Sequence, residues 1–144
     1  MAFNVLVVDD SAAMRAMIIK TLRISGVPLG EIYQASNGLE GLRAVEENWV
    51  DVALVDLNMP VMGGEEMIDQ LRGQPDTADL PIVVISTESS ETRIASLRAK
   101  GTGFIHKPFK PEEIRAQITN VTGVIYESES TDGDSFVPGG GFDF

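Results

Sequence analysis

The segment Val52-Ala53-Leu54-Val55-Asp56-Leu57-Asn58-Met59-Pro60 decides the fold of this chain. Its first four residues form a continuous apolar run, which is typical of a strand buried on both faces of a parallel sheet. Pro60 has no backbone N–H and disfavours helix at the residue before it, so we expect the strand to end close to Asp56. Ligands of open α/β sheets bind just beyond the carboxyl ends of the strands. Asp56 is therefore our candidate for the reacting residue.

Length and composition restrict the class of protein. The 144 residues suffice for one domain with a sizeable core, and the absence of cysteine excludes disulfides and thiolate metal sites. The formal net charge of −11 argues against nucleic-acid binding and against attraction to anionic membranes. We find neither a stretch long enough to span a bilayer nor a signal peptide. We therefore expect a cytoplasmic protein whose partners carry basic patches.

Strand and helix patterns alternate five times along the chain. The strands are predicted at 3–8, 31–35, 52–56, 80–86 and 103–106. The helices are predicted after Ser11, along a face formed by Leu42, Val45 and Trp49, through Met67, over 91–100, and from Pro111 onward. This alternation predicts an α/β fold, a five-stranded parallel sheet with five helices on both faces. Right-handed crossovers and the chain length favour the flavodoxin-like strand order 2-1-3-4-5.

That topology gathers polar residues at one edge of the sheet, where all the carboxyl ends of the strands lie. The set comprises Asp9 and Asp10, Asp56, Ser86 and Lys107. Neighbouring carboxylates repel by roughly 1 kcal/mol per pair in water and about 4 kcal/mol when partly desolvated, so a positive charge must offset them. Oxygen-only ligands of this kind favour Mg²⁺.

These residue types suit the transfer of a phosphoryl group. The carboxylate of Asp56 can act as a nucleophile without a separate base. A bound metal and Lys107 would neutralise the charge that develops on the transferred oxygens. Ser86 can donate a hydrogen bond to the product phosphate.

Four separated motifs resemble those of response-regulator receiver domains over about residues 3–125. They are Asp9-Asp10, Asp56 with Met59-Pro60 and Gly64, Ser86, and Lys107-Pro108-Phe109. The resemblance implies a Mg²⁺-dependent phosphoacceptor that receives a phosphoryl group from a histidine kinase on Asp56. Such a protein is not an enzyme toward other substrates, because it catalyses only its own phosphorylation and dephosphorylation.

The resemblance also implies roles for individual residues. Asp10, Asp56 and the backbone carbonyl of Asn58 would bind the metal, with Asp9 in support, and the Lys107–Pro108 bond would be cis. On phosphorylation Ser86 would move toward the phosphoryl group and Phe104, a tyrosine in chemotaxis regulators, would turn inward. This movement would reshape a switching face, formed by the fourth helix, the fifth strand and the last helix. Asn58 and Glu88 resemble the pair that flanks the site in chemotaxis regulators, so they should tune dephosphorylation.

Several functions remain open at this point. No second domain follows in the sequence, so we expect a stand-alone, CheY-like regulator, monomeric, that acts on a downstream protein such as a flagellar motor switch or a phosphatase. A phosphotransfer intermediate or a receiver that signals by binding alone are the alternatives. Asn58 disfavours a haloacid-dehalogenase-like phosphatase, which needs a second aspartate two residues after its nucleophile. The acidic pair Asp9-Asp10 disfavours a flavodoxin-like FMN carrier, because it would repel the phosphate of the cofactor.

The composition changes after residue 125. We expect residues 1–125 to form the receiver domain and residues 126–144, which are acidic and rich in glycine, to form a disordered tail. The tail nevertheless contains Phe136, Phe142 and Phe144, half of the six phenylalanines of the chain. An alternative is therefore a docking peptide, for a partner or for the switching face.

Overall fold

The computed structural model describes residues 2–124 and contains the predicted alternation of strands and helices. The strands are β1 (Phe3–Val8), β2 (Leu29–Ala35), β3 (Val52–Val55), β4 (Ile82–Ser86) and β5 (Gly103–His106). The helices are α1 (Ala12–Ile24), α2 (Gly38–Glu47), α3 (Gly64–Arg72), α4 (Glu91–Arg98) and α5 (Pro111–Thr122). The boundary at residue 125 and the tail at 126–144 lie outside the described residues.

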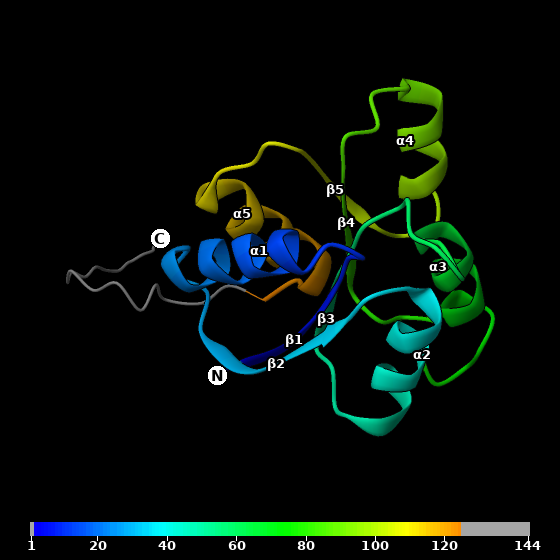
Figure 1. Cartoon of the computed structure of the whole chain (residues 1–144), viewed down its shortest axis with the longest axis horizontal. Helices are drawn as coiled ribbons and strands as arrows, with labels where there is room; N and C mark the ends of the chain where they lie inside the picture. Colours follow the sequence, from blue (N-terminus) through cyan, green and yellow to red (C-terminus); the bar gives the residue numbers. More distant parts are fainter. Residues whose placement is uncertain (1, 125–144) are drawn as a thin grey trace.

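All strand pairs are parallel, and the sheet has the predicted order β2-β1-β3-β4-β5. Helices α1 and α5 cover one face of the sheet, and α2, α3 and α4 cover the other (Figure 1). Each face of the sheet has its own hydrophobic core, and successive residues of a strand point into the two cores in turn. Val5 and Val7 therefore pack toward α1 and α5, whereas Leu6 and Val8 pack toward α2, α3 and α4. Burial on both faces explains the continuous apolar runs of the strands.

Polar side chains define where several helices begin. Ser11 accepts a hydrogen bond from Met14 N, Asn37 from Glu40 N, and Ser90 from Arg93 N, so each caps the helix that follows it. Asn37 is thus the N-cap of α2, and Gly38 is its first residue. Pro111 occupies the first turn of α5, as predicted, where its missing N–H costs no hydrogen bond.

The prediction that Trp49 lies on the buried face of the second helix is wrong. Helix α2 ends at Glu47, because the next residue, Asn48, adopts an extended conformation. The backbone N–H of Asn48 makes the last hydrogen bond of the helix, to Ala44 O. Trp49 therefore lies in the loop before β3, with 76% of its surface exposed. Its indole N–H donates to Asp51 Oδ1 over 2.9 Å.

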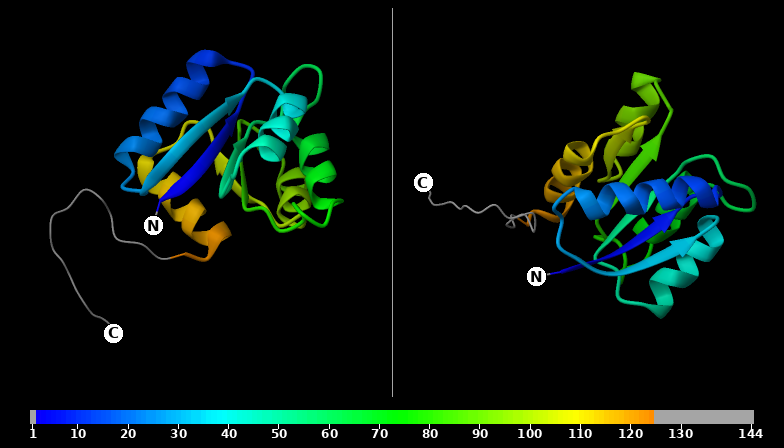
Figure 2. Two further views of the ribbon diagram at one scale, coloured as in Figure 1. Left: turned by 90° about the horizontal axis from the view of Figure 1, so that it is seen from below. Right: turned by 60° about the vertical axis from the view of Figure 1, so that its left-hand side comes forward.

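The beginning of β1 lies near the end of α5 (Figure 2). This is the edge of the sheet opposite the one at which the predicted site residues follow their strands. None of the helices described within residues 2–124 is long and apolar enough to cross a lipid bilayer.

Candidate phosphoacceptor site

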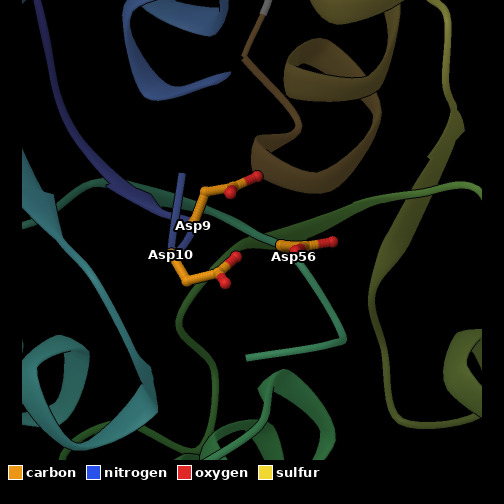
Figure 3. Close-up of side chains that lie close together, drawn as sticks. All are labelled: Asp9, Asp10 and Asp56. Atoms are coloured by element: carbon orange, nitrogen blue, oxygen red, sulfur yellow. The ribbon is translucent and has the colours of Figure 1, made fainter. Parts of the chain in front are cut away.

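Three carboxylates meet where β1 and β3 end (Figure 3). Asp9 and Asp10 follow β1, and Asp56 follows β3, which is the neighbouring strand. The backbone N–H of Asp56 donates to Val8 O over 2.9 Å and so continues the pairing of the strands to the site itself. One oxygen atom from each carboxylate lies within 4.8 Å of the others. Three separate acidic side chains are thus brought into a single cluster.

Asp9 is the most constrained member of this cluster. Its side chain is 2% exposed, and its Oδ1 accepts a hydrogen bond from Ser11 N over 2.9 Å. Its backbone carbonyl accepts from Arg15 Nη1 over 2.6 Å, while Arg15 Nε donates to Gln34 Oε1 on β2. Arg15 was not singled out from the sequence, because an arginine on an exposed helix surface gives no local signal of such a contact. It secures the position of the acidic pair from α1.

Lys107 lies opposite two of the carboxylates. Its Nζ is 3.4 Å from Asp9 Oδ2 and 3.5 Å from Asp56 Oδ1. The backbone N–H of Lys107 donates to Ser86 O over 2.8 Å, which carries the pairing of β4 and β5 to the edge of the sheet. The Lys107–Pro108 peptide bond is cis, as predicted. One positive charge therefore faces a cluster of three acidic groups.

The electrostatics of Asp56 follow from this crowding. Burial is the main cause that raises the pKa of Asp56 above its ordinary value, and the nearby charge of Asp9 raises it further. The charge of Lys107 acts in the opposite direction without outweighing burial. Ionised Asp56 is thus left without full compensation, and an added cation would favour its charged form.

The loop after β3 approaches Asp56 closely. Gly64, the first residue of α3, lies so near the Asp56 carbonyl oxygen that a Cβ atom would collide with the backbone there. Val61 in the same loop has a φ of 69°, a left-handed conformation that is strained for a β-branched residue. The Gly38 N–H donates to Met62 O over 2.8 Å and ties the loop to α2. Asn58 lies in this loop and is exposed.

The residues predicted to take part in switching occupy β4, β5 and the loop between β4 and α4. Ser86 ends β4 with 1% exposure, and its Oγ accepts a hydrogen bond from Glu88 N over 3.0 Å. The Glu88 carboxylate accepts from Ser90 N over 2.9 Å and lies 3.6 Å from Arg93 Nη1. Phe104 on β5 is already buried, at 7% exposure, in the core beneath α2, α3 and α4. The structure thus contains Phe104 in an inward position, and its predicted movement stays a prediction.

A small hollow of about 300 Å³ adjoins Lys107 on the α1 side of the site. Met14 and Met17 of α1 line it together with Thr87, Pro108 and Phe109. The helical spacing of the two methionines is compatible with core packing or with a partner surface. Met14 packs against the core, whereas Met17 is 56% exposed and is available to a partner.

Comparison with known proteins agrees with this geometry. The model of the response regulator receiver domain family matches residues 5–119. The chain is 34% identical over 122 residues to the chemotaxis protein CheY homolog of Campylobacter jejuni, covering 83% of this chain and 92% of that protein. It is 37% identical over 116 residues to the transcriptional regulatory protein PrrA of Mycobacterium tuberculosis, of which it spans only 48%.

A solved structure extends the comparison to three dimensions. The Vibrio cholerae chemotaxis protein CheY4 superposes with a TM-score of 0.73 at 35% sequence identity, covering 84% of this chain and 99% of that one. The sheet order, the cluster of carboxylates and the family match lead to one conclusion. The chain belongs to the response regulator receiver domain family, whose members are phosphoryl-accepting signalling domains.

Proposed function

We propose that this chain is a single-domain response regulator of the chemotaxis type, which accepts a phosphoryl group from a histidine kinase on Asp56 and thereby changes its binding to other proteins. The observation that carries the proposal is the convergence of Asp9, Asp10 and Asp56 within 4.8 Å, with Lys107 beside them. The similarity to the chemotaxis protein CheY homolog, of which 92% is covered, supports the chemotaxis type. The net charge of −11 also disfavours direct contact with DNA.

The donor set fits Mg²⁺. All three side chains offer carboxylate oxygens, which hard divalent cations prefer, and Lys107 balances only part of their charge. Asp10 and Asp56 would hold the ion with the backbone carbonyl of Asn58, and Asp9 would support it. When bound, Mg²⁺ supplies positive charge to the oxygens of the phosphoryl group.

The chain itself supplies the nucleophile and a cation. An Asp56 carboxylate oxygen attacks the phosphorus of a phosphohistidine, the P–N bond breaks, and the imidazole leaves with the bonding electron pair and takes up a proton. The product is an acyl phosphate on Asp56. Lys107, which already contacts Asp56 Oδ1, exchanges part of that contact for the new phosphoryl oxygens.

Burial of Asp56 serves this reaction in a defined way. Burial leaves fewer water molecules on the ionised carboxylate that must be removed before attack, and the same desolvation raises the pKa of Asp56. The phosphodonor protein would approach from the α1 side, where Met17 and Phe109 border the hollow next to Lys107. That surface is apolar and lies beside the reacting group.

Ser86, Phe104, Asn58 and Glu88 carry the response to phosphorylation in this proposal. The Ser86 hydroxyl accepts a hydrogen bond from Glu88 N, so its own proton can be donated to a phosphoryl oxygen. That contact would draw the β4–α4 loop toward Asp56 and bias the packing around Phe104. Asn58 and Glu88 would flank the path of the water that hydrolyses the acyl phosphate and so adjust its lifetime.

Incubation with Mg²⁺ and acetyl phosphate, followed by measurement of the intact mass, tests the proposal. We expect the wild-type chain to gain one phosphoryl group, the Asp56→Asn variant to gain none, and chelation of Mg²⁺ to prevent the gain in the wild type. An Asp51→Asn variant provides a matched control, because Asp51 directly precedes β3 whereas Asp56 directly follows it, at the other end of the strand. Continuous release of phosphate from unrelated monoesters would instead indicate a phosphatase.

A further inference from the structure

The exposed tryptophan lies at the junction of two hollows on the side of the molecule away from the carboxylates. The larger hollow, of about 780 Å³, lies between the ends of α2 and α3. The smaller, of about 310 Å³, lies beside the start of β1 and the end of α5. Trp49 and Val50 line both, so the two hollows adjoin at these residues, and we call them together the Trp49 groove. Leu39, Leu42, Val45, Leu71 and Leu80 also line the part between the helices.

Trp49 is held in place although it is exposed. Its indole N–H donates to Asp51 Oδ1, and its backbone carbonyl accepts from Asn4 Nδ2 over 3.1 Å. The N–H of Asn4 in turn donates to Asp51 Oδ2 over 2.8 Å, which ties this loop to β1. A large aromatic side chain that is fixed in orientation and exposed beside a groove with both apolar and polar lining is a feature of binding surfaces.

The last residues that the structure describes line this groove. Thr122 and Val124, the last turn of α5 and the residue after its cap, line the smaller hollow together with Trp49. Gly123 between them has a φ of 70°, which ends the helix and turns the chain away from its axis. Val124, the last residue that the structure describes, therefore lies in the same hollow as Trp49, and the end of α5 can be followed to this edge of the sheet in Figure 2.

The sequence after residue 124 matches the groove in character. Residues 135–142, Ser-Phe-Val-Pro-Gly-Gly-Gly-Phe, carry no charge, and Phe144 follows two residues later. The acidic residues at 127, 129, 132 and 134 precede them as a spacer. Eleven residues at 125–135 reach up to about 36 Å when extended, which is comparable to the width of a domain of this size. The phenylalanines can therefore reach any part of the groove.

The charged residues that line the groove determine which part of residues 125–144 can bind there. Glu46, Asp76 and Asp79 line its larger half and would repel the acidic spacer, whereas the uncharged aromatic stretch meets no such cost. Arg43 is the one basic residue among the described lining residues, and Asp143 is the one acidic residue in 135–144. The repulsion of the acidic spacer and the opposite charges of Arg43 and Asp143 therefore both favour binding of residues 136–144 over binding of the acidic part.

We propose that residues 136–144 of this chain bind in the Trp49 groove, with phenylalanine side chains packed on Trp49 and on the apolar side chains between α2 and α3. This interaction is intramolecular and is independent of phosphoryl transfer. It also differs from docking on the switching face, because no described residue of α4 or β5 lines the groove.

The experiment uses the fact that Trp49 is the single tryptophan of the chain. In the full chain, substitution of Phe136→Ser, Phe142→Ser and Phe144→Ser together should shift the tryptophan emission to longer wavelength. It should also raise the acrylamide quenching constant at least about twofold if the bound form holds more than half of the molecules. A matched control, Ser128→Ala with Ser130→Ala and Thr131→Ala, changes three residues of the same segment without removing an aromatic ring and should leave both values unchanged.

Two results would overturn the proposal. Equal emission and quenching in wild type and the triple phenylalanine variant would show that these rings do not cover Trp49. A difference that disappears on dilution would assign the groove to a second copy of the chain. Asp56→Asn should retain the wild-type tryptophan signal, and the phenylalanine variant should still gain a phosphoryl group, so failure of this proposal is distinguishable from failure of the proposed function.

Discussion

The ammonium group of Lys107 lies 3.5 Å from Asp56 Oδ1, although 51 residues of sequence separate the two. The same Nζ is 3.4 Å from Asp9 Oδ2, so one flexible cation serves two carboxylates. Neither contact is as short as a strong charge-assisted hydrogen bond, which is about 2.7–2.9 Å. The site is thus held with incomplete charge balance, and its stability should respond to any change in that balance.

Removal of the Asp56 charge should stabilise the fold. Because the pKa of Asp56 is raised above its ordinary value of 3.8, the folded state prefers the protonated form, and stability is lost as the pH rises through the folded pKa. We expect Asp56→Asn to increase the free energy of unfolding at pH 7 by on the order of 1 kcal/mol, the scale of one partly screened repulsion with Asp9. Urea unfolding measures the change.

The pH dependence provides the check on this first prediction. The difference between wild type and Asp56→Asn should shrink as the pH falls toward 3.8, because the wild-type carboxyl is then protonated as well. Asp76→Asn, an exposed aspartate in the loop after α3, should change stability little at any pH. A destabilised Asp56→Asn at pH 7 would mean that the contact with Lys107 outweighs burial.

Mg²⁺ should raise the melting temperature of the wild-type chain. A ligand that binds only the folded state at 100 times its Kd adds about 2.7 kcal/mol to the free energy of unfolding. Asp10→Asn removes one exposed carboxylate of the cluster without disturbing a buried contact, so most of that increase should be lost. Differential scanning calorimetry with and without Mg²⁺ compares the two, with Asp76→Asn as the control. An identical response in the Asp10→Asn variant would rule out this cluster as the binding site.

Gly64 should tolerate no side chain. A Cβ atom there would collide with the backbone carbonyl of Asp56, and a backbone atom cannot rotate away. We expect Gly64→Ala to lower the free energy of unfolding by about 1–3 kcal/mol and to slow phosphoryl transfer by displacing Asp56. At Gly73, which ends α3, the nearest atom to a Cβ would be 3.4 Å away, so Gly73→Ala is a matched control with a small effect. Comparable losses in both variants would contradict this interpretation.

Ion pairs hold α4 against α3. Lys100 Nζ lies 2.9 Å from Glu65 and 2.8 Å from Asp69, while Leu97 is the fully buried side chain of α4. Asp69 is exposed and the other two side chains are only half-buried, so Lys100→Met should cost less than about 1 kcal/mol in global stability. It should nevertheless increase amide hydrogen exchange in α4, because few apolar contacts hold this helix. Lys20→Met, on the exposed surface of α1, is the matched control.

The effect of Lys100→Met should depend on pH. A hydrogen bond from Lys100 lowers the pKa of Glu65 below 4.5, so the pairing stabilises the fold above that value and is lost as the pH falls through the folded pKa. Faster exchange in α4 of the Lys100→Met variant should therefore be seen at neutral pH and fade at acidic pH. Unchanged exchange at neutral pH would show that the Lys100 pairs do not hold the helix.

The convergence of the side chains at the site could be predicted from the sequence because the carboxyl ends of parallel strands lie next to one another at one edge of the sheet. Asp9, Asp56 and Lys107 each follow an apolar run, and the order of the strands then brings them together. Trp49 was misplaced because its spacing continued the helical pattern, whereas Asn48 ends the helix one residue earlier. Neither the Arg15 contact nor the positive φ of Val61 has a local pattern, since both depend on what the folded chain brings nearby.

Location of the modified residue tests the central claim most directly. After reaction of the wild-type chain with acetyl phosphate and Mg²⁺, reduction with borohydride converts an acyl phosphate of aspartate to homoserine, which peptide mass mapping can locate. We predict homoserine at position 56 and unmodified aspartate at positions 9 and 10. Modification at position 9 or 10 in place of 56, or a stable phosphoryl group on a hydroxyl residue, would contradict the assignment of Asp56 as the phosphoacceptor.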